Sequence, residues 1–126
     1  MSTREYTPLD NAIRGIESAL HTLLGPPTVT GKASPGAELP EAELSADERT
    51  RVGRLMRVDH AGEVAAQGLY HGQAITARLP RVREKMARAA REEGDHLAWC
   101  ETRVREMGTH LSYLNPAWYL GAVGIG

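Results

Sequence analysis

The stretch SADERTRVGRLMRVDHAGEVAAQGLYHGQAITAR, residues 45–78, decides the fold of this chain. It opens with a capping box, in which the side chains of Ser45 and Glu48 can each accept a hydrogen bond from the other residue's backbone N–H. Apolar residues then recur on one side of a helix: Val52, Met56, Ala66, Tyr70, Ala74 and Ala77. Leu79-Pro80 ends the pattern, because a residue before proline avoids the α region. We therefore predict a long helix from Ser45 to about Arg78.

The following stretch, PRVREKMARAAREEGDHLAWCETRVREM at residues 80–107, predicts a second long helix that Gly108 closes. Its apolar stripe contains Val82, Met86, Ala89, Ala90, Leu97, Cys100, Val104 and Met107. Most of its arginines lie off this stripe, as is typical of a solvated face. Two long helices joined by a tight break form an antiparallel hairpin, which is half of a four-helix bundle.

The flanking segments predict shorter elements. Thr7 and Pro8 can begin a helix that Gly25 ends, and its apolar residues Ile13, Ile16, Leu20 and Leu24 recur at helical spacing. Residues 25–44 are rich in Pro, Gly, Ser and Thr and have no period, which indicates a linker. A turn at residues 109–116 precedes an apolar stretch, 117–126, that begins another helix. The predicted fold class is all-α.

Composition excludes several functional classes. The chain has 126 residues, which favours one small domain, and its formal net charge of -1 argues against nucleic-acid binding through bulk charge. A single cysteine excludes an internal disulfide, and no apolar run is long enough to cross a membrane. The first residues contain Glu5 and Asp10 and lack an uncharged apolar core, so we expect neither a secretory signal nor a clear transit peptide.

Acidic residues occupy positions where the core-facing stripe requires apolar side chains. Glu63 lies seven residues after Met56 and seven before Tyr70, and Glu93 holds the equivalent inward position on the second helix. His96 follows three residues later on the same face, giving a Glu-x-x-His pair. Buried carboxylates need compensation, and oxygen with imidazole ligands suits iron or manganese. Ferritin-like bundles use one Glu on each of two helices and Glu-x-x-His on each of the others, so this chain carries half of that set.

Each feature also has an ordinary explanation. A lone Glu-x-x-His pair often occurs by chance. A single acid such as Glu63 can be solvated if the inward face of its helix is assigned incorrectly. We expect Asp59 to be a local hydrogen-bond partner, and His60 and His71 to lie at the surface or at helix ends. Glu92 and Asp95 flank the motif and are expected to be solvated, with Asp95 alternatively holding an imidazole of a second chain. Tyr70 and Cys100 are expected to be core residues, the cysteine an inert one.

Longer stretches around these residues resemble one known family. LMRVDHAGEVAAQGLYHGQ at residues 55–73 resembles the first metal-ligand helix of the demethoxyubiquinone hydroxylase family. EEGDHLAWCE at residues 92–101 looks like its second, and YLNPAWY at residues 113–119 is similar to the turn that follows. The resemblance covers residues 45–126 and implies a ferritin-like di-iron monooxygenase of ubiquinone biosynthesis. It implies that Glu63 is a terminal carboxylate ligand, Glu93 a bridging carboxylate and His96 an imidazole ligand.

The resemblance also implies cofactors, substrates and a location. A complete site holds two iron ions and uses dioxygen to hydroxylate the ring of demethoxyubiquinol. Peripheral contact with the cytoplasmic side of a bacterial cell membrane is implied, and other ubiquinone-biosynthesis proteins are candidate partners. Trp118, Tyr119 and Leu120 either dip into the membrane interface or begin a buried core helix. The helix before the linker either covers the bundle or touches lipid.

The family continues with a second helix pair that supplies another Glu and another Glu-x-x-His, whereas this sequence ends at Gly126. The expected organisation is an amphipathic helix over residues 1–24, a linker over 25–44 and the N-terminal half of a di-iron domain over 45–126. Three interpretations remain: a fragment, a chain that has lost half the site, or a homodimer that combines two hairpins. Competing functions are a ferroxidase-type protein of the ferritin-like group and a non-catalytic helical-hairpin module that binds a partner or a metal.

Overall fold

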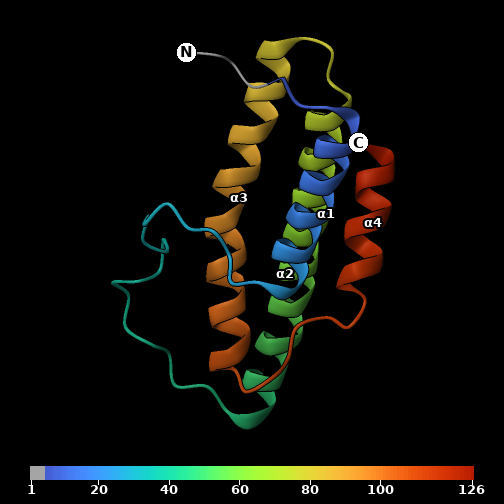
Figure 1. Ribbon diagram of the computed structural model, residues 1–126. Coiled ribbons are helices and arrows are strands. Elements are labelled where there is room, and N and C mark those ends of the chain that lie inside the picture. Colours follow the sequence, from blue (N-terminus) through green and yellow to red (C-terminus); the bar gives the residue numbers. More distant parts are fainter. Residues whose placement is uncertain (1–4) are drawn as a thin grey trace.

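The computed structural model describes residues 5–126, which contain four helices (Figure 1). They are α1 (Pro8–Leu24), α2 (Ala46–Thr76), α3 (Pro80–Glu106) and α4 (Asn115–Ile125). Helices α2 and α3 form the predicted hairpin, α1 lies along α2, and α4 flanks α2 on the side away from α3 (Figure 1). No strand occurs among these residues, so the all-α prediction is confirmed. Residues 1–4, which we assigned to the first segment, lie outside the described part.

Local sequence signals set the helix ends. Thr7 and Ser45 each begin a helix with a complete capping box, in which the partner acid is Asp10 or Glu48. These hydrogen bonds to the backbone and side chains of Thr7 and Ser45 lower the pKa values of the two acids. Gly108 follows the end of α3 with φ of 74°, a left-handed conformation that favours glycine. Each predicted long helix ends within two residues of the observed position, because these signals act locally.

Glycines on α2 permit the close approach of α4. A Cβ atom added to Gly68 would lie 2.5 Å from the carbonyl oxygen of Tyr119, and one added to Gly72 would lie 2.5 Å from that of Val123. The interior cluster consists of Val64, Leu97 and Tyr119, with Ala19, Leu23 and Val123 packed against it. Glycine therefore weakens the helix propensity of α2 but allows a backbone-to-backbone contact that any side chain would block.

Helix α1 presents its most apolar side to solvent. Ile13, Ile16, Leu20 and Leu24 are 54–82% exposed, whereas the smaller Ala19 and the neighbouring Leu23 face the core. These four residues and the exposed Leu9 form what we call the α1 stripe. Helix α1 therefore covers the bundle, as one of the two alternatives predicted, but it does so through Ala19 and Leu23 and not through the stripe.

Residues 25–44 contain no helix, as predicted, but they are fastened along α3 and we call them the strap. The backbone N–H and hydroxyl of Thr30 donate to the two carboxylate oxygens of Asp95 at 2.7 and 2.6 Å. Trp99 Nε1 donates to the carbonyl oxygen of Lys32 at 3.3 Å. Asp95 is only 4% exposed, so the expectation that it is solvated is wrong. The strap supplies its partners from 65 residues away in sequence, which no local pattern indicates.

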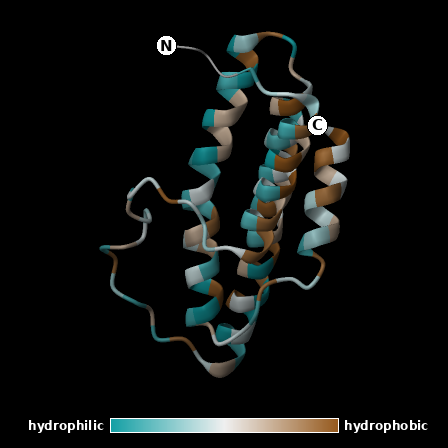
Figure 2. Ribbon diagram, in the orientation of Figure 1, coloured by the Kyte–Doolittle hydropathy of each residue, from teal (hydrophilic) through white to brown (hydrophobic). Residues whose placement is uncertain are grey.

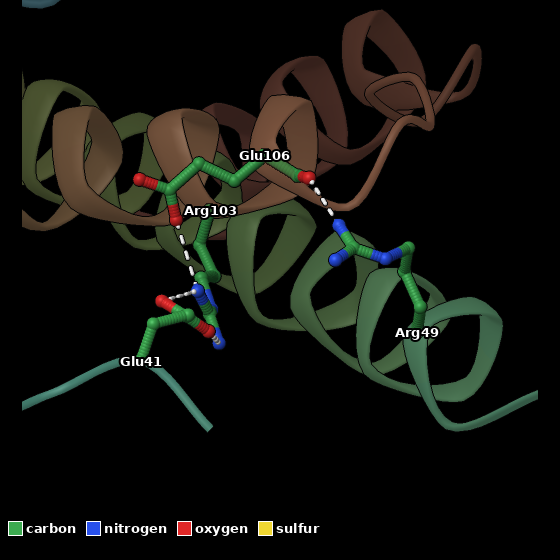
Figure 3. Close-up of polar contacts among 4 residues, drawn as sticks. All are labelled: Glu41, Arg49, Arg103 and Glu106. Carbon is green, nitrogen blue, oxygen red and sulfur yellow. Dashed lines mark hydrogen bonds and ion pairs between the residues drawn. The ribbon is translucent and has the colours of Figure 1, made fainter. Parts of the chain in front are cut away.

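An arginine pair fastens the far end of the strap and the base of the hairpin (Figure 3). Arg103 on α3 forms a two-pronged ion pair with Glu41 of the strap, both N–O distances being 2.8 Å. It also contacts Glu106 at 3.0 Å, and Arg49 on α2 donates to the carbonyl oxygen of Glu106 at 3.0 Å. These contacts join the start of α2, the end of α3 and the strap.

Hydropathy differs strongly between the helices. Helix α3 is mostly hydrophilic, and α4 becomes hydrophobic towards the C-terminal end (Figure 2). Within α4, Tyr119 is buried, as the core-helix alternative predicts, whereas Trp118 and Leu120 are 47% and 62% exposed, and their contact with a membrane stays a prediction. Among the described residues, no helix combines the length and hydropathy needed to cross a membrane.

Candidate metal centre

The hairpin brings Glu63 of α2 together with Glu93 and His96 of α3. One potential ligand atom from each of the three residues lies within 4.8 Å of the others. His96 Nδ1 is 3.3 Å from Glu93 Oε2 and 3.8 Å from Glu63 Oε2. It is the one group of three or more such side chains found in residues 5–126. The predicted inward phase of both helices therefore produces a convergent cluster.

The cluster is partly open to solvent. The side chains of Glu93, Glu63 and His96 are 14%, 29% and 44% exposed, respectively. Next to His96, the indole of Trp99 lies with its ring centroid 5.2 Å from the imidazole centroid. Since Trp99 also bonds the strap, the packing around His96 depends on both α3 and the strap.

Burial and charge make the two carboxylates an unfavourable pair. Burial, together with the neighbouring Glu93 carboxyl, raises the pKa of Glu63 to about 7, and the nearby His96 opposes the shift. Two close carboxylates cannot both ionise cheaply, so Glu63 retains a proton near neutral pH in the chain by itself.

The donor set fits a divalent metal ion. Glu93 Oε2 is buried and makes no hydrogen bond within the described structure, although His96 Nδ1 lies 3.3 Å away. An unpartnered buried carboxylate oxygen is costly, and a cation would satisfy it while neutralising both acids. Two carboxylates and one imidazole are typical ligands of iron and manganese. The three residues therefore form a candidate metal centre that supplies one histidine and two acids.

Two histidines face α4, one of them buried and the other half-buried. His60 is 4% exposed, and its Nδ1 lies 3.4 Å from Nδ2 of Asn115 on α4. His71 Nδ1 lies 2.7 Å from the hydroxyl oxygen of Tyr119. The expectation that both lie at the surface or at helix ends is wrong for His60, which is buried, and His71 is half-buried, because α4 covers this side of α2. The spacing of His60, Val64, Gly68 and His71 is itself helical, and this second stripe was the available signal.

The other residues near the motif match expectation only in part, since Asp59 makes no hydrogen bond among the described residues. Asp59 and Glu92 are exposed, and Tyr70 and Cys100 are partly buried. Burial raises the pKa of the Cys100 thiol to about 11, with the nearby acids adding to the shift. A thiol held protonated in this way is a poor nucleophile and a poor ligand, which agrees with the expectation of an inert cysteine.

Fold and cluster together define an all-helical protein with a hairpin that carries a candidate carboxylate–histidine metal centre. The family model described as "Ubiquinone biosynthesis protein COQ7" matches residues 50–126, which include the whole cluster. The chain belongs to this family, as the resemblance predicted, and its fold agrees with a ferritin-like helical bundle.

Curated relatives agree with the family model. The chain is 52% identical over 126 residues to a 3-demethoxyubiquinol 3-hydroxylase of Nitrosococcus oceani, covering 100% of this chain and 59% of the relative. Proteins of the same name from Legionella pneumophila and Stutzerimonas stutzeri are 53% and 51% identical, covering 94% and 99% of this chain. The chain spans only 56% and 58% of those two relatives. No solved structure matches the chain.

Proposed function

We propose that this chain contributes Glu63, Glu93 and His96 to the di-iron centre of a monooxygenase that hydroxylates 3-demethoxyubiquinol in ubiquinone biosynthesis. The observation that carries the proposal is the convergence of ligand atoms from these three side chains within 4.8 Å, among them a buried carboxylate oxygen of Glu93 that makes no hydrogen bond. Relatives that are 52% and 53% identical to this chain are named 3-demethoxyubiquinol 3-hydroxylase, and their names support demethoxyubiquinol as the substrate. The exposed side of the cluster leaves room for further ligands, which a longer chain or a second copy would supply.

The residues of the chain have separate tasks in this mechanism. Bound iron supplies the redox chemistry that activates dioxygen. Glu63 holds a proton near neutral pH and would release it to serve as a ligand, which would remove its unfavourable interaction with Glu93. His96 would hold the metal through a ring nitrogen, and Trp99 restricts the orientation of that ring. Both helices of the hairpin must remain in register for the three ligands to meet.

Metal binding tests the proposal directly. We expect anaerobic titration with Co²⁺, which reports on the Fe²⁺ site by its absorbance, to show binding that Glu63→Gln and His96→Asn each abolish. Glu92→Gln and His110→Asn are matched controls, because both residues are exposed and lie outside the cluster. Binding that survives both cluster variants would contradict the proposal. Turnover of demethoxyubiquinol by the iron-loaded protein, against oxidation of Fe²⁺ alone, separates a monooxygenase from a ferroxidase.

We also propose that the protein attaches peripherally to the cytoplasmic face of the cell membrane through the α1 stripe. Leu9, Ile13, Ile16, Leu20 and Leu24 are 54–82% exposed on one side of α1. Such a surface is costly in water and is typical of helices that lie in a membrane interface. A polyprenylated quinol resides in the membrane, so attachment would bring the enzyme to its substrate.

Vesicle flotation tests the attachment. We expect the chain to float with phospholipid vesicles and Ile16→Asp with Leu20→Asp to abolish flotation, because two charges would enter the apolar interface. Asn11→Asp adds a charge at another exposed position of α1 and is the control. Equal flotation of the double variant and the control would exclude this role for the stripe.

A further inference from the structure

The strap crosses α3 at the turn that carries two of the three cluster residues, residues 93–96, which we call the ligand turn (Figure 1). Gly94 and Asp95 are the middle residues of this turn, and both are buried. Successive residues of a helix are about 100° apart, so the middle residues of a Glu-x-x-His pair point away from the face that the outer two share. The strap therefore contacts the ligand turn on the side opposite the cluster.

Two hydrogen bonds and one backbone contact seat the strap on the ligand turn. The backbone N–H and the hydroxyl of Thr30 donate to separate oxygens of Asp95, at 2.7 and 2.6 Å. The carbonyl group of Thr28 lies over Gly94, where a Cβ atom would overlap the carbonyl oxygen. The strap thus occupies both middle positions of the turn, one of them through a carboxylate that is only 4% exposed.

The packing of α3 explains why a contact on that side matters for the cluster. Among the described helices, only α2 has its backbone close to that of α3, and the cluster spans this contact. Small rotations of a helix about its own axis are a common motion where helices pack, and here they would move Glu93 and His96 together relative to Glu63. A backbone contact on the opposite side of α3 opposes that rotation, and the strap provides one.

The strap is itself tied to its surroundings on both sides of Thr30. Oγ1 of Thr28 lies 2.8 Å from Nε2 of His21 on α1, and α1 packs on α2. Further along the strap, the carbonyl oxygen of Lys32 accepts the hydrogen bond from Trp99, whose indole lies beside the imidazole of His96. The ligand turn is therefore linked to α2 twice, directly across the hairpin and indirectly through the strap and α1.

We propose that the strap is a positioning element of the metal centre, in which Thr30 and Asp95 hold Glu93 and His96 at the rotation of α3 that lets them meet Glu63. The inference rests on the proposed function and extends it to two residues that lie outside the cluster and act through its members. Removing a contact that orients metal ligands typically lowers metal affinity about 10–100-fold. Detaching the strap should therefore weaken metal binding although all three ligands remain in the chain.

Co²⁺ titration of strap variants tests the inference, at a temperature at which circular dichroism shows every variant to be folded. Thr30→Val removes one donor to Asp95, and we expect it to weaken Co²⁺ binding roughly tenfold and to shift the visible d–d bands, which report on ligand geometry. Thr30→Ser keeps both donors and should restore the affinity and the bands of the parent. Glu41→Gln weakens the contact of the strap with Arg103, far from the ligand turn, and is the matched control that should bind like the parent.

A second substitution separates the seating of the strap from the stability of α3. Gly94→Ala raises the helix propensity of α3, but its Cβ atom would displace the carbonyl group of Thr28. We therefore expect this variant to bind Co²⁺ more weakly than the parent although its own helix is more favourable. Binding as tight as that of the parent would contradict the inference.

A readout without metal separates this inference from the proposed function. In the metal-free chain, we expect ¹³C relaxation of the His96 ring to show greater motion in Thr30→Val than in the parent, Thr30→Ser or Glu41→Gln. Parent-like Co²⁺ affinity and bands in Thr30→Val, or unchanged motion of the ring, would overturn the inference and leave the metal centre standing. A parent chain that binds no Co²⁺ would refute the proposed function, and the ring motion would then decide by itself whether the strap positions the cluster.

Discussion

Glu63 is the residue at which stability and the proposed metal binding oppose each other. Its pKa in the folded chain is about 7, above the ordinary value of 4.5, because burial and the Glu93 carboxyl both disfavour its charge. Below the ordinary value the acid is protonated in the folded and unfolded states, and its contribution to stability is fully present. As the pH rises through 7 the folded chain must ionise a poorly solvated group, so this contribution is lost.

We expect Glu63→Gln to raise the melting temperature of the metal-free chain at pH 8, because the amide resembles the protonated acid and carries no charge. At pH 4.5 the variant and the parent should melt at nearly the same temperature. Thermal melts followed by circular dichroism at the two pH values provide the measurement, and Glu92→Gln, an exposed neighbour of the cluster, is the control. A lower melting temperature of the variant at pH 8 would show that Glu63 has a structural role instead.

At the scale of elements, glycine has opposite effects on stability at two positions of α2. Gly68 meets the backbone of α4, and a Cβ atom there would lie 2.5 Å from the carbonyl oxygen of Tyr119. Gly62 is exposed, and no described atom lies within 4 Å of a Cβ atom built there. Helix propensity favours alanine at both positions, but packing opposes it at one of them.

We expect Gly68→Ala to destabilise the chain by about 1–3 kcal/mol, because α4 must move away from α2. Gly62→Ala should stabilise it by about 0.5–1 kcal/mol, since only backbone entropy changes. Urea unfolding gives both free energies. Stabilisation by both substitutions would show that α4 does not pack on α2 as described.

The strap is a second element with a testable contact. We expect Thr30→Val to remove the hydroxyl donor to Asp95, lower the melting temperature, and speed hydrogen exchange of the strap amides at residues 28–32. Trp99 fluorescence should shift to the red, because its indole bonds Lys32 of the same strap. Thr102→Val, at an exposed position of α3, controls for the substitution itself. Unchanged exchange rates in Thr30→Val would show that the contact does not hold the strap.

At the scale of the whole molecule, the open side of the cluster bears on assembly. Each copy supplies two acids and one histidine, and a twofold arrangement of two hairpins would double that set. We expect Co²⁺ to convert the chain from monomer to dimer in sedimentation velocity. Glu93→Gln should remain monomeric because it removes the unpartnered oxygen, whereas Glu92→Gln should dimerise. A monomer that binds Co²⁺ at full occupancy would exclude assembly through the metal.

Sequence by itself determined the four helices, their ends and the inward phase of Glu63, Glu93 and His96. Capping boxes, prolines and helical periodicity act over a few residues, so they can be interpreted without knowing the fold. The sequence also identified the family of the chain, because the family motifs lie on these same helices.

Tertiary structure alone decided which side of α1 faces water and how the strap lies. The burial of Asp95 depends on Thr30, 65 residues away, and that of His60 depends on Asn115, 55 residues away. These contacts follow from the close packing of α4 and the strap against the hairpin. Local propensity carries no information about partners at such separations, because their meeting is set by the packing of whole elements.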